Sequence, residues 1–206
     1  MLRHTARLPI HPSPRAYNLT VVDEPPLLWF RVAKVCTRTL LAQLRANGLD
    51  PPERRDQRYL TDRHRDHLAF AFVRNPWDRL VSAWQARVVG SDRLTLPVDV
   101  RAASQELSGF IDHLETLDLD DCDAHVRRQR ALVDVGRVDF LGRFEQFDDD
   151  ATELFGRLGL RFDPQLRRNI SAPRADHRQF YDDETAARVA RLYEVDVRTF
   201  GYRFER

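Results

Sequence analysis

Two short apolar runs in the first half of the chain, each followed by a segment with helical spacing, constrain the fold most strongly. The runs are 27–32 (LLWFRV) and 68–73 (LAFAFV). An apolar run of this length, bounded by proline or charged residues, is typical of a strand buried on both faces. Leucines at 40, 41 and 44 then share one helix face, and Asn47–Gly48 is a typical helix end. Strands that alternate with amphipathic helices predict a mostly parallel sheet flanked by helices, and therefore an α/β fold.

The rest of the chain continues this alternation. We expect a helix from Pro76 with Trp84 in its core stripe, a helix over 104–117, a strand over 138–144, a helix through 151–158 and a last helix over about 182–199. The proline-rich residues 1–26 are expected to form an extended N-terminal arm, and residues 27–206 a single domain. Ligands of such sheets bind beyond the carboxyl ends of the strands.

Composition narrows the possible functions. The chain has 206 residues, 42% of them hydrophobic, and a formal net charge of +1, which gives no support to a nucleic-acid partner. It contains no apolar stretch of the roughly 20 residues that a membrane-spanning helix needs. Cys36 and Cys122 do not form a disulfide framework, and no cysteine or histidine spacing matches a metal site, so we expect no metal and a reducing, cytoplasmic setting.

The segment that follows the first apolar run has the features of an anion-binding loop. Lys34 is the sole lysine of the chain and stands between a predicted strand and a predicted helix. Backbone N–H groups at a helix N-terminus attract anions, and the hydroxyls of Thr37 and Thr39 add donors. The glycines of a nucleotide-triphosphatase P-loop are missing, which disfavours a P-loop kinase. An ordinary strand-to-helix turn with one surface lysine is the simpler alternative.

The segment after the second run, RNPWDRLVSAW at 74–84, places an arginine at a strand end and a serine two turns into the next helix. Arg74 can grip a phosphate bidentately, and Ser82 can donate a hydrogen bond to the same group. We interpret Asp78 and Arg79 as a surface pair and Trp84 as a core residue.

These two segments, in this order, resemble the donor-binding motifs of sulfotransferases that use 3′-phosphoadenosine 5′-phosphosulfate (PAPS). The first is similar to the 5′-phosphosulfate loop and the second to the 3′-phosphate motif. The later segments 123–129 (DAHVRRQ), 139–145 (DFLGRFE) and 200–202 (FGY), with Asn169 before the last, resemble further motifs of the chondroitin- and HNK-1-type carbohydrate sulfotransferases (sulfotransferase family 2) and their bacterial counterparts. The resemblance covers roughly residues 27–204.

The resemblance implies a P-loop-NTPase-like three-layer sandwich and transfer of a sulfuryl group from PAPS to a hydroxyl, without a metal. It assigns the donor to two sets of residues. The first is Lys34, Val35, Cys36, Thr37, Arg38 and Thr39, and the second is Arg74 and Ser82. Lys34 is also expected to stabilise the leaving oxygen. The expected acceptor is a glycan or glycoconjugate, with the loops 50–66 and 90–103 as its candidate binding site. If a membrane anchor has been removed from this chain, the expected location of the protein is the Golgi lumen and not the cytoplasm.

Several alternatives stay open at this point. His125 is the candidate general base, since it matches the family's D-x-H segment, and a structural histidine beside Asp123 is the competing interpretation. Glu145 is a second candidate base, or else orients Arg143, which with Asn169 is expected near the nucleotide or acceptor. His64 and His67 are weaker candidates. Arg38 and the altered 123–129 segment leave room for an inactive protein that binds PAP, the desulfated product, on a sulfotransferase fold.

Overall fold

The computed structural model describes residues 11–89, 94, 96–168 and 176–204. Its centre is a five-stranded sheet in the order β3-β1-β2-β4-β5. The strands are β1 (Tyr17–Asp23), β2 (Pro26–Phe30), β3 (Arg54–Gln57), β4 (Leu68–Val73) and β5 (Phe140–Arg143).

The core of the sheet is parallel, as the apolar runs predict. Strands β2, β4 and β5 run in the same direction, with Phe30 opposite Ala71 and Phe72 opposite Gly142. Strands β1 and β3 are added on one side in antiparallel orientation. The predicted α/β class and the flanking helices are therefore confirmed, and the sheet as a whole is mixed.

Strand β1 lies within the stretch 1–26, for which we expected an extended surface arm. Alternation explains its place in the sheet, since Tyr17 and Leu19 are 5% and 2% exposed and point to one side. A two-residue turn then joins Asp23 to Pro26, the last register pair of β1 and β2. Residues 1–10 lie outside the described residues.

Eight α-helices are described. They are α1 (Thr37–Ala46), α2 (Pro76–Trp84), α3 (Val98–Arg101), α4 (Leu107–Glu115), α5 (Gln129–Leu132), α6 (Phe147–Arg157), α7 (Asp183–Leu192) and α8 (Glu194–Phe200). Short 3-10 helices cover Ala103–Gln105, Phe144–Gln146 and His177–Phe180, and a π-helix covers Gln85–Val89. The predicted last helix is two helices that meet at Tyr193. Among the described residues, no helix combines the length and the apolar character that a membrane-spanning segment requires.

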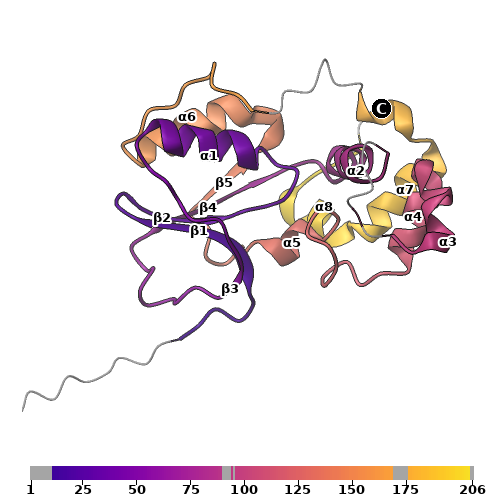
Figure 1. Cartoon of the computed structure of the whole chain (residues 1–206), viewed down its shortest axis with the longest axis horizontal. Coiled ribbons are helices and arrows are strands. Elements are labelled where there is room, and N and C mark those ends of the chain that lie inside the picture. The colour runs from indigo at the N-terminus through magenta and orange to yellow at the C-terminus, as the bar shows by residue number, and fades with distance from the viewer. Residues whose placement is uncertain (1–10, 90–93, 95, 169–175, 205–206) are drawn as a thin grey trace, which may run out of the picture.

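The helices form two groups around the sheet (Figure 1). Helices α1 and α6 cover one face, where Phe72 packs against Phe147 with ring centroids 5.4 Å apart. Helices α2, α4, α7 and α8 gather beyond the carboxyl ends of the parallel strands and enclose a second apolar cluster. The loops that leave β2 and β4 therefore lie where the two clusters meet.

Candidate active site

The loop between β2 and α1 contains two non-glycine residues in the left-handed region. Lys34 has φ of 69° and Cys36 has φ of 43°. Such residues cost on the order of 1–3 kcal/mol each and are found mainly at functional sites. A left-handed residue beside a right-handed one is the backbone form of many anion-binding turns. Lys34 and Cys36 thus hold, without glycine, a conformation that glycine adopts most easily.

The two threonines of this loop hold backbone carbonyls. Thr37 Oγ1 donates to the carbonyl of Val32 at 3.0 Å. Thr39 Oγ1 donates to the carbonyl of Arg168 at 3.2 Å and accepts from its N–H at 3.1 Å. Val35, a residue of the loop, is buried. The Thr37 hydroxyl therefore braces the loop, and the Thr39 hydroxyl ties helix α1 to Arg168. A ligand would accept a hydrogen bond from either hydroxyl only in place of these bonds.

Arg38, in the first turn of α1, lines an open groove of about 820 Å³ on the outer side of that helix. The other lining residues are Leu41, Ala42, Arg45, Ala46, Glu53, Leu166 and Arg168. Arg38 is the one residue of the predicted donor site found among them.

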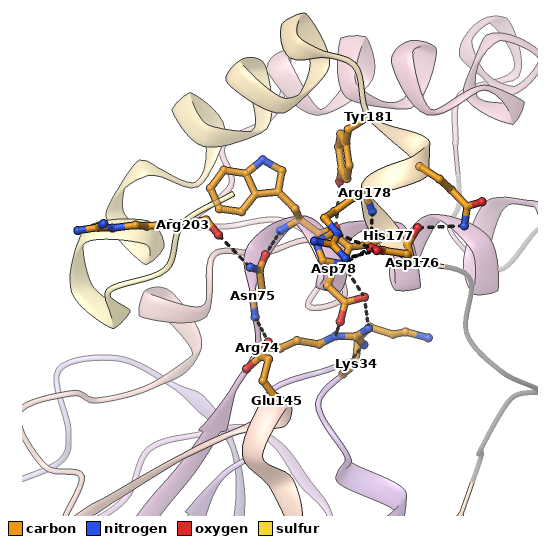
Figure 2. Close-up of polar contacts among 12 residues, drawn as sticks. Lys34, Arg74, Asn75, Asp78, Glu145, Asp176, His177, Arg178, Tyr181 and Arg203 are labelled. Atoms are coloured by element: carbon orange, nitrogen blue, oxygen red, sulfur yellow. Dashed lines mark hydrogen bonds and ion pairs between the residues drawn. The ribbon is translucent and has the colours of Figure 1, made fainter. Parts of the chain in front are cut away.

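Arg74 follows the end of β4 and contacts both the Lys34 loop and helix α2. Its side chain is 1% exposed, and its Nη1 donates to the carbonyl of Lys34 at 3.0 Å. The other edge of the guanidinium faces Asp78. Nε donates to Oδ2 at 2.7 Å, while Nη2 lies 2.6 Å from Oδ1 in an ion pair without hydrogen-bond geometry. Its carbon lies 4.1 Å from the centroid of the Phe144 ring. Figure 2 shows Asp78 between Arg74 and His177.

The structure explains why α2 begins directly after Arg74. Pro76 occupies the first turn, where a missing N–H costs little, and Asn75 Oδ1 accepts from the N–H of Trp77 at 3.0 Å. Ser82 then lies two turns into the helix with its side chain 6% exposed, so its hydroxyl is sheltered from bulk water.

The prediction that Arg79 pairs at the surface is wrong. Its side chain is 1% exposed and its guanidinium donates to three backbone carbonyls. These are the carbonyls of Ala33 (from Nε, 3.0 Å), Arg127 (from Nη1, 2.9 Å) and Ala124 (from Nη2, 3.0 Å). One side chain therefore contacts the residue before Lys34 and the residue before His125.

His125 lies on a turn whose geometry is set by Asp123. The Asp123 carboxylate accepts from the backbone N–H of His125 at 2.8 Å and from its ring Nδ1 at 2.7 Å. The bond to His125 holds the pKa of Asp123 at about 2. Because a carboxylate accepts only, Nδ1 carries the proton in this contact and Nε2 remains as the basic nitrogen. Arg87, from the π-helix, approaches Nδ1 to 3.4 Å.

Gln129 and Asp196 tie this turn to the strand end. The Gln129 side chain accepts from the N–H of Arg74 at 2.9 Å and donates to the carbonyl of Arg74 at 2.8 Å. The Asp196 carboxylate accepts the N–H groups of Gln129 and Arg130 at 2.7 and 2.8 Å, and so caps α5. Burial raises the pKa of Asp196.

Glu145 connects the segment after β4 with the C-terminal segment that contains Tyr202. Its carboxylate accepts from the N–H of Asn75 at 2.6 Å and from the Tyr202 hydroxyl at 3.0 Å. Arg143 donates to the carbonyl of Phe200 at 2.6 Å and lies over the Tyr202 ring. The segment FGY at 200–202 thus receives contacts from both. Asn169 lies outside the described residues.

His177 enters the site from the C-terminal part of the chain, and sequence reasoning missed it. Its Nδ1 lies 3.9 Å from Asp78 Oδ1, and burial lowers its pKa. Asp78 was missed as well, although its spacing of four from Arg74 was a usable signal. No local pattern distinguishes His177 from a surface residue, whereas Arg79 stands within the segment 74–84 that resembles the 3′-phosphate motif.

The expected acceptor loops are only partly described. Strand β3 lies at the edge of the sheet, two strands from β2, with all four residues exposed. Arg58 donates to the carbonyls of Ser13 and Pro14 at 2.6 and 2.8 Å, and so fastens the N-terminal segment. Within the loop 90–103, residues 90–93 and 95 lie outside the described part of the chain. His64 and His67 are both 8% exposed and pack edge to face against each other.

Comparison with known proteins gives a match to one family model. The model of the "Sulfotransferase family" matches residues 17–203. A solved structure of a sulfotransferase from Alicyclobacillus acidocaldarius is similar at 20% sequence identity with a TM-score of 0.30, and the match covers 69% of this chain and 60% of that chain. The match thus covers less than two thirds of the length of that chain. A search of curated proteins finds no significant match.

Proposed function

The chain belongs to the sulfotransferase family, and from this premise we propose that it transfers a sulfuryl group from PAPS to a hydroxyl of an acceptor and releases PAP. The observation that carries the proposal is the left-handed loop at Lys34 and Cys36, held to the strand-end residue Arg74 through the carbonyl of Lys34. This bond ties the arginine that we assign to the 3′-phosphate to the loop that we assign to the 5′-phosphosulfate. We assign residues 34–39 to the 5′-phosphosulfate of the donor, and Arg74 with Ser82 to its 3′-phosphate.

Sulfuryl transfer is an in-line displacement, so the protein contributes mainly position and charge. The acceptor oxygen forms a bond to sulfur while the bond between sulfur and the 5′-phosphate oxygen breaks. Lys34 and the backbone N–H groups of the loop stabilise the negative charge that develops on that oxygen. One well-placed donor of this kind contributes about 3 kcal/mol to the transition state.

The acceptor proton passes to His125 in this mechanism. Asp123 holds Nδ1 of the ring at 2.7 Å, which leaves Nε2 to accept the proton. Glu145 is the weaker candidate base, because both of its carboxylate oxygens already accept hydrogen bonds from Asn75 and Tyr202.

The acceptor we propose is a hydroxyl of a glycan or glycoconjugate, and the setting we propose is the cytoplasm. The glycan acceptor rests on the family resemblance. The cytoplasm rests on composition, with the Golgi lumen as the alternative if a membrane anchor has been removed. Nucleic acid is not proposed, since the formal net charge is +1.

Calorimetric titration with PAP, ATP and 5′-AMP tests the donor assignment. We expect PAP to bind much more tightly than the other two, because only PAP carries the 3′-phosphate. Arg74→Ala and Ser82→Ala should each weaken PAP binding. Ser82→Ala is the cleaner variant, since Arg74 also bonds to Lys34, and Ser104→Ala, at another buried serine, is the matched control.

Equal affinity for ATP and PAP, or none for PAP, would refute the donor site. PAP binding without turnover of PAPS on a panel of hydroxyl-bearing glycans would favour the inactive PAP-binding alternative.

A further inference from the structure

The guanidinium of Arg79 connects the two halves of the candidate site. It donates from Nε to the carbonyl of Ala33 and from Nη2 to the carbonyl of Ala124, both at 3.0 Å. Each carbonyl belongs to the peptide unit that also contains the N–H of the next residue, which is Lys34 in one case and His125 in the other. The third bond, from Nη1 to the carbonyl of Arg127 at 2.9 Å, holds the far end of the His125 turn.

This arrangement is rigid. A guanidinium is planar with its donors in a fixed fork, so the acceptors it bridges are fixed relative to one another. The side chain is 1% exposed, and water therefore does not compete for its donors. The negative charge of the buried Asp196 carboxylate acts on the Arg79 guanidinium. No other described side chain is hydrogen-bonded to both the residue before Lys34 and the residue before His125.

We infer that Arg79 is a positioning residue that fixes the donor loop at Lys34 relative to the turn that bears His125. Binding of the donor nucleotide at the loop therefore also stabilises the turn. This inference rests on the proposed function for its catalytic consequence. A misplacement of about 1 Å between reacting groups can cost about 100-fold in rate. Arg79 thus controls turnover more than donor affinity.

Hydrogen–deuterium exchange with and without PAP provides a test that needs no acceptor. In the wild type, PAP should slow exchange in residues 33–39 and also in 124–129. In Arg79→Lys, which keeps the charge but loses the fork, protection of 33–39 should remain while the protection that PAP confers on 124–129 falls by about tenfold. Arg79→Gln is the second variant, in case the lysine variant does not fold.

Arg137→Lys is the matched control. Arg137 also donates to three backbone carbonyls, those of His64, Arg65 and His67, but it contacts neither half of the site. A purely structural role of Arg79 predicts that both lysine variants lose similar thermal stability and that both retain the PAP response of 124–129.

Turnover supplies the second readout. With PAPS and the glycan panel, Arg79→Lys should lower kcat by about 100-fold and change the KM for PAPS by less than about threefold. Retained coupling in the exchange experiment, or a kcat no lower than that of Arg137→Lys, would overturn the inference while leaving the proposed function intact. A wild type that does not bind PAP would instead refute the proposed function, and the inference with it.

Discussion

Replacement of Asp78 by asparagine should tighten the binding of PAP. In the structure, the Asp78 carboxylate occupies the Nε and Nη2 edge of Arg74 at 2.7 and 2.6 Å. A phosphate offers the same pair of oxygens to the same edge. If the 3′-phosphate binds there, it must displace Asp78, and part of its binding free energy is spent on breaking the ion pair.

The magnitude follows from the burial of the two groups. The side chains of Arg74 and Asp78 are 1% and 19% exposed, and removal of one partner of a buried pair costs about 3–5 kcal/mol of stability. Asparagine keeps one oxygen acceptor, so we expect a loss of about 3 kcal/mol in the free energy of unfolding. The dissociation constant of PAP should fall by about 10- to 100-fold, equivalent to about 1.4–2.8 kcal/mol.

Two measurements check this. Urea denaturation gives the loss of stability, and calorimetry gives the affinity for PAP. Glu194→Gln is the control, because Glu194 also pairs with an arginine four residues away, but at an exposed site where such pairs contribute little. Weaker PAP binding in Asp78→Asn, with the control unchanged, would show that Asp78 orients Arg74 toward the ligand and would refute the competition argument.

Three further predictions follow from single contacts. Lys34→Ala should abolish sulfuryl transfer while weakening PAP binding much less, because its charge is needed mainly at the leaving oxygen; near-normal turnover would contradict its assignment. The pKa of Asp123 is lowered from 3.8 to about 2 by its bond to His125, so its stabilising contribution is complete above about pH 4 and is lost as the pH falls through 2. Acid unfolding followed by circular dichroism should therefore begin at higher pH in Asp123→Asn, and an unchanged acid transition would argue against the bond. Gly142→Ala should destabilise the fold by about 1–3 kcal/mol in denaturant titrations, because a methyl group at 142 overlaps the Phe72 ring. Gly156→Ala, where nothing lies within 4 Å, should cause no loss, and equal behaviour of the two variants would rule out the steric argument.

The elements that carry local signals were predictable. Strands β2 and β4 were found from apolar runs, since burial on both faces leaves a largely apolar sequence. Strand β5 lies within the predicted strand 138–144. Helix α2 was found from Pro76 and its core stripe. Strand β1 was missed, because prolines surround it and only its pairing with β2 shows that it belongs to the sheet.

Some residues of the candidate site were likewise predictable from local sequence, and others were not. Lys34, Arg74 and Ser82 stand in two contiguous segments, so their chemistry could be inferred from residue type and spacing. The contact of Arg79 with both Ala33 and Ala124 could not, because a buried and an exposed arginine look alike in a sequence. Burial depends on which segments fold over the side chain, and here those segments lie about 45 residues away on either side.

The sequence by itself therefore determined the α/β class, the loop after β2 and the strand-end arginine, because each depends on neighbours within one element. Only the tertiary structure decided that His177 approaches Asp78 and that Arg79 joins the Lys34 loop to the His125 turn. Charged side chains acquire their partners when distant segments pack together, and the hydrogen bonds that result follow from three-dimensional geometry that spacing along the chain does not encode.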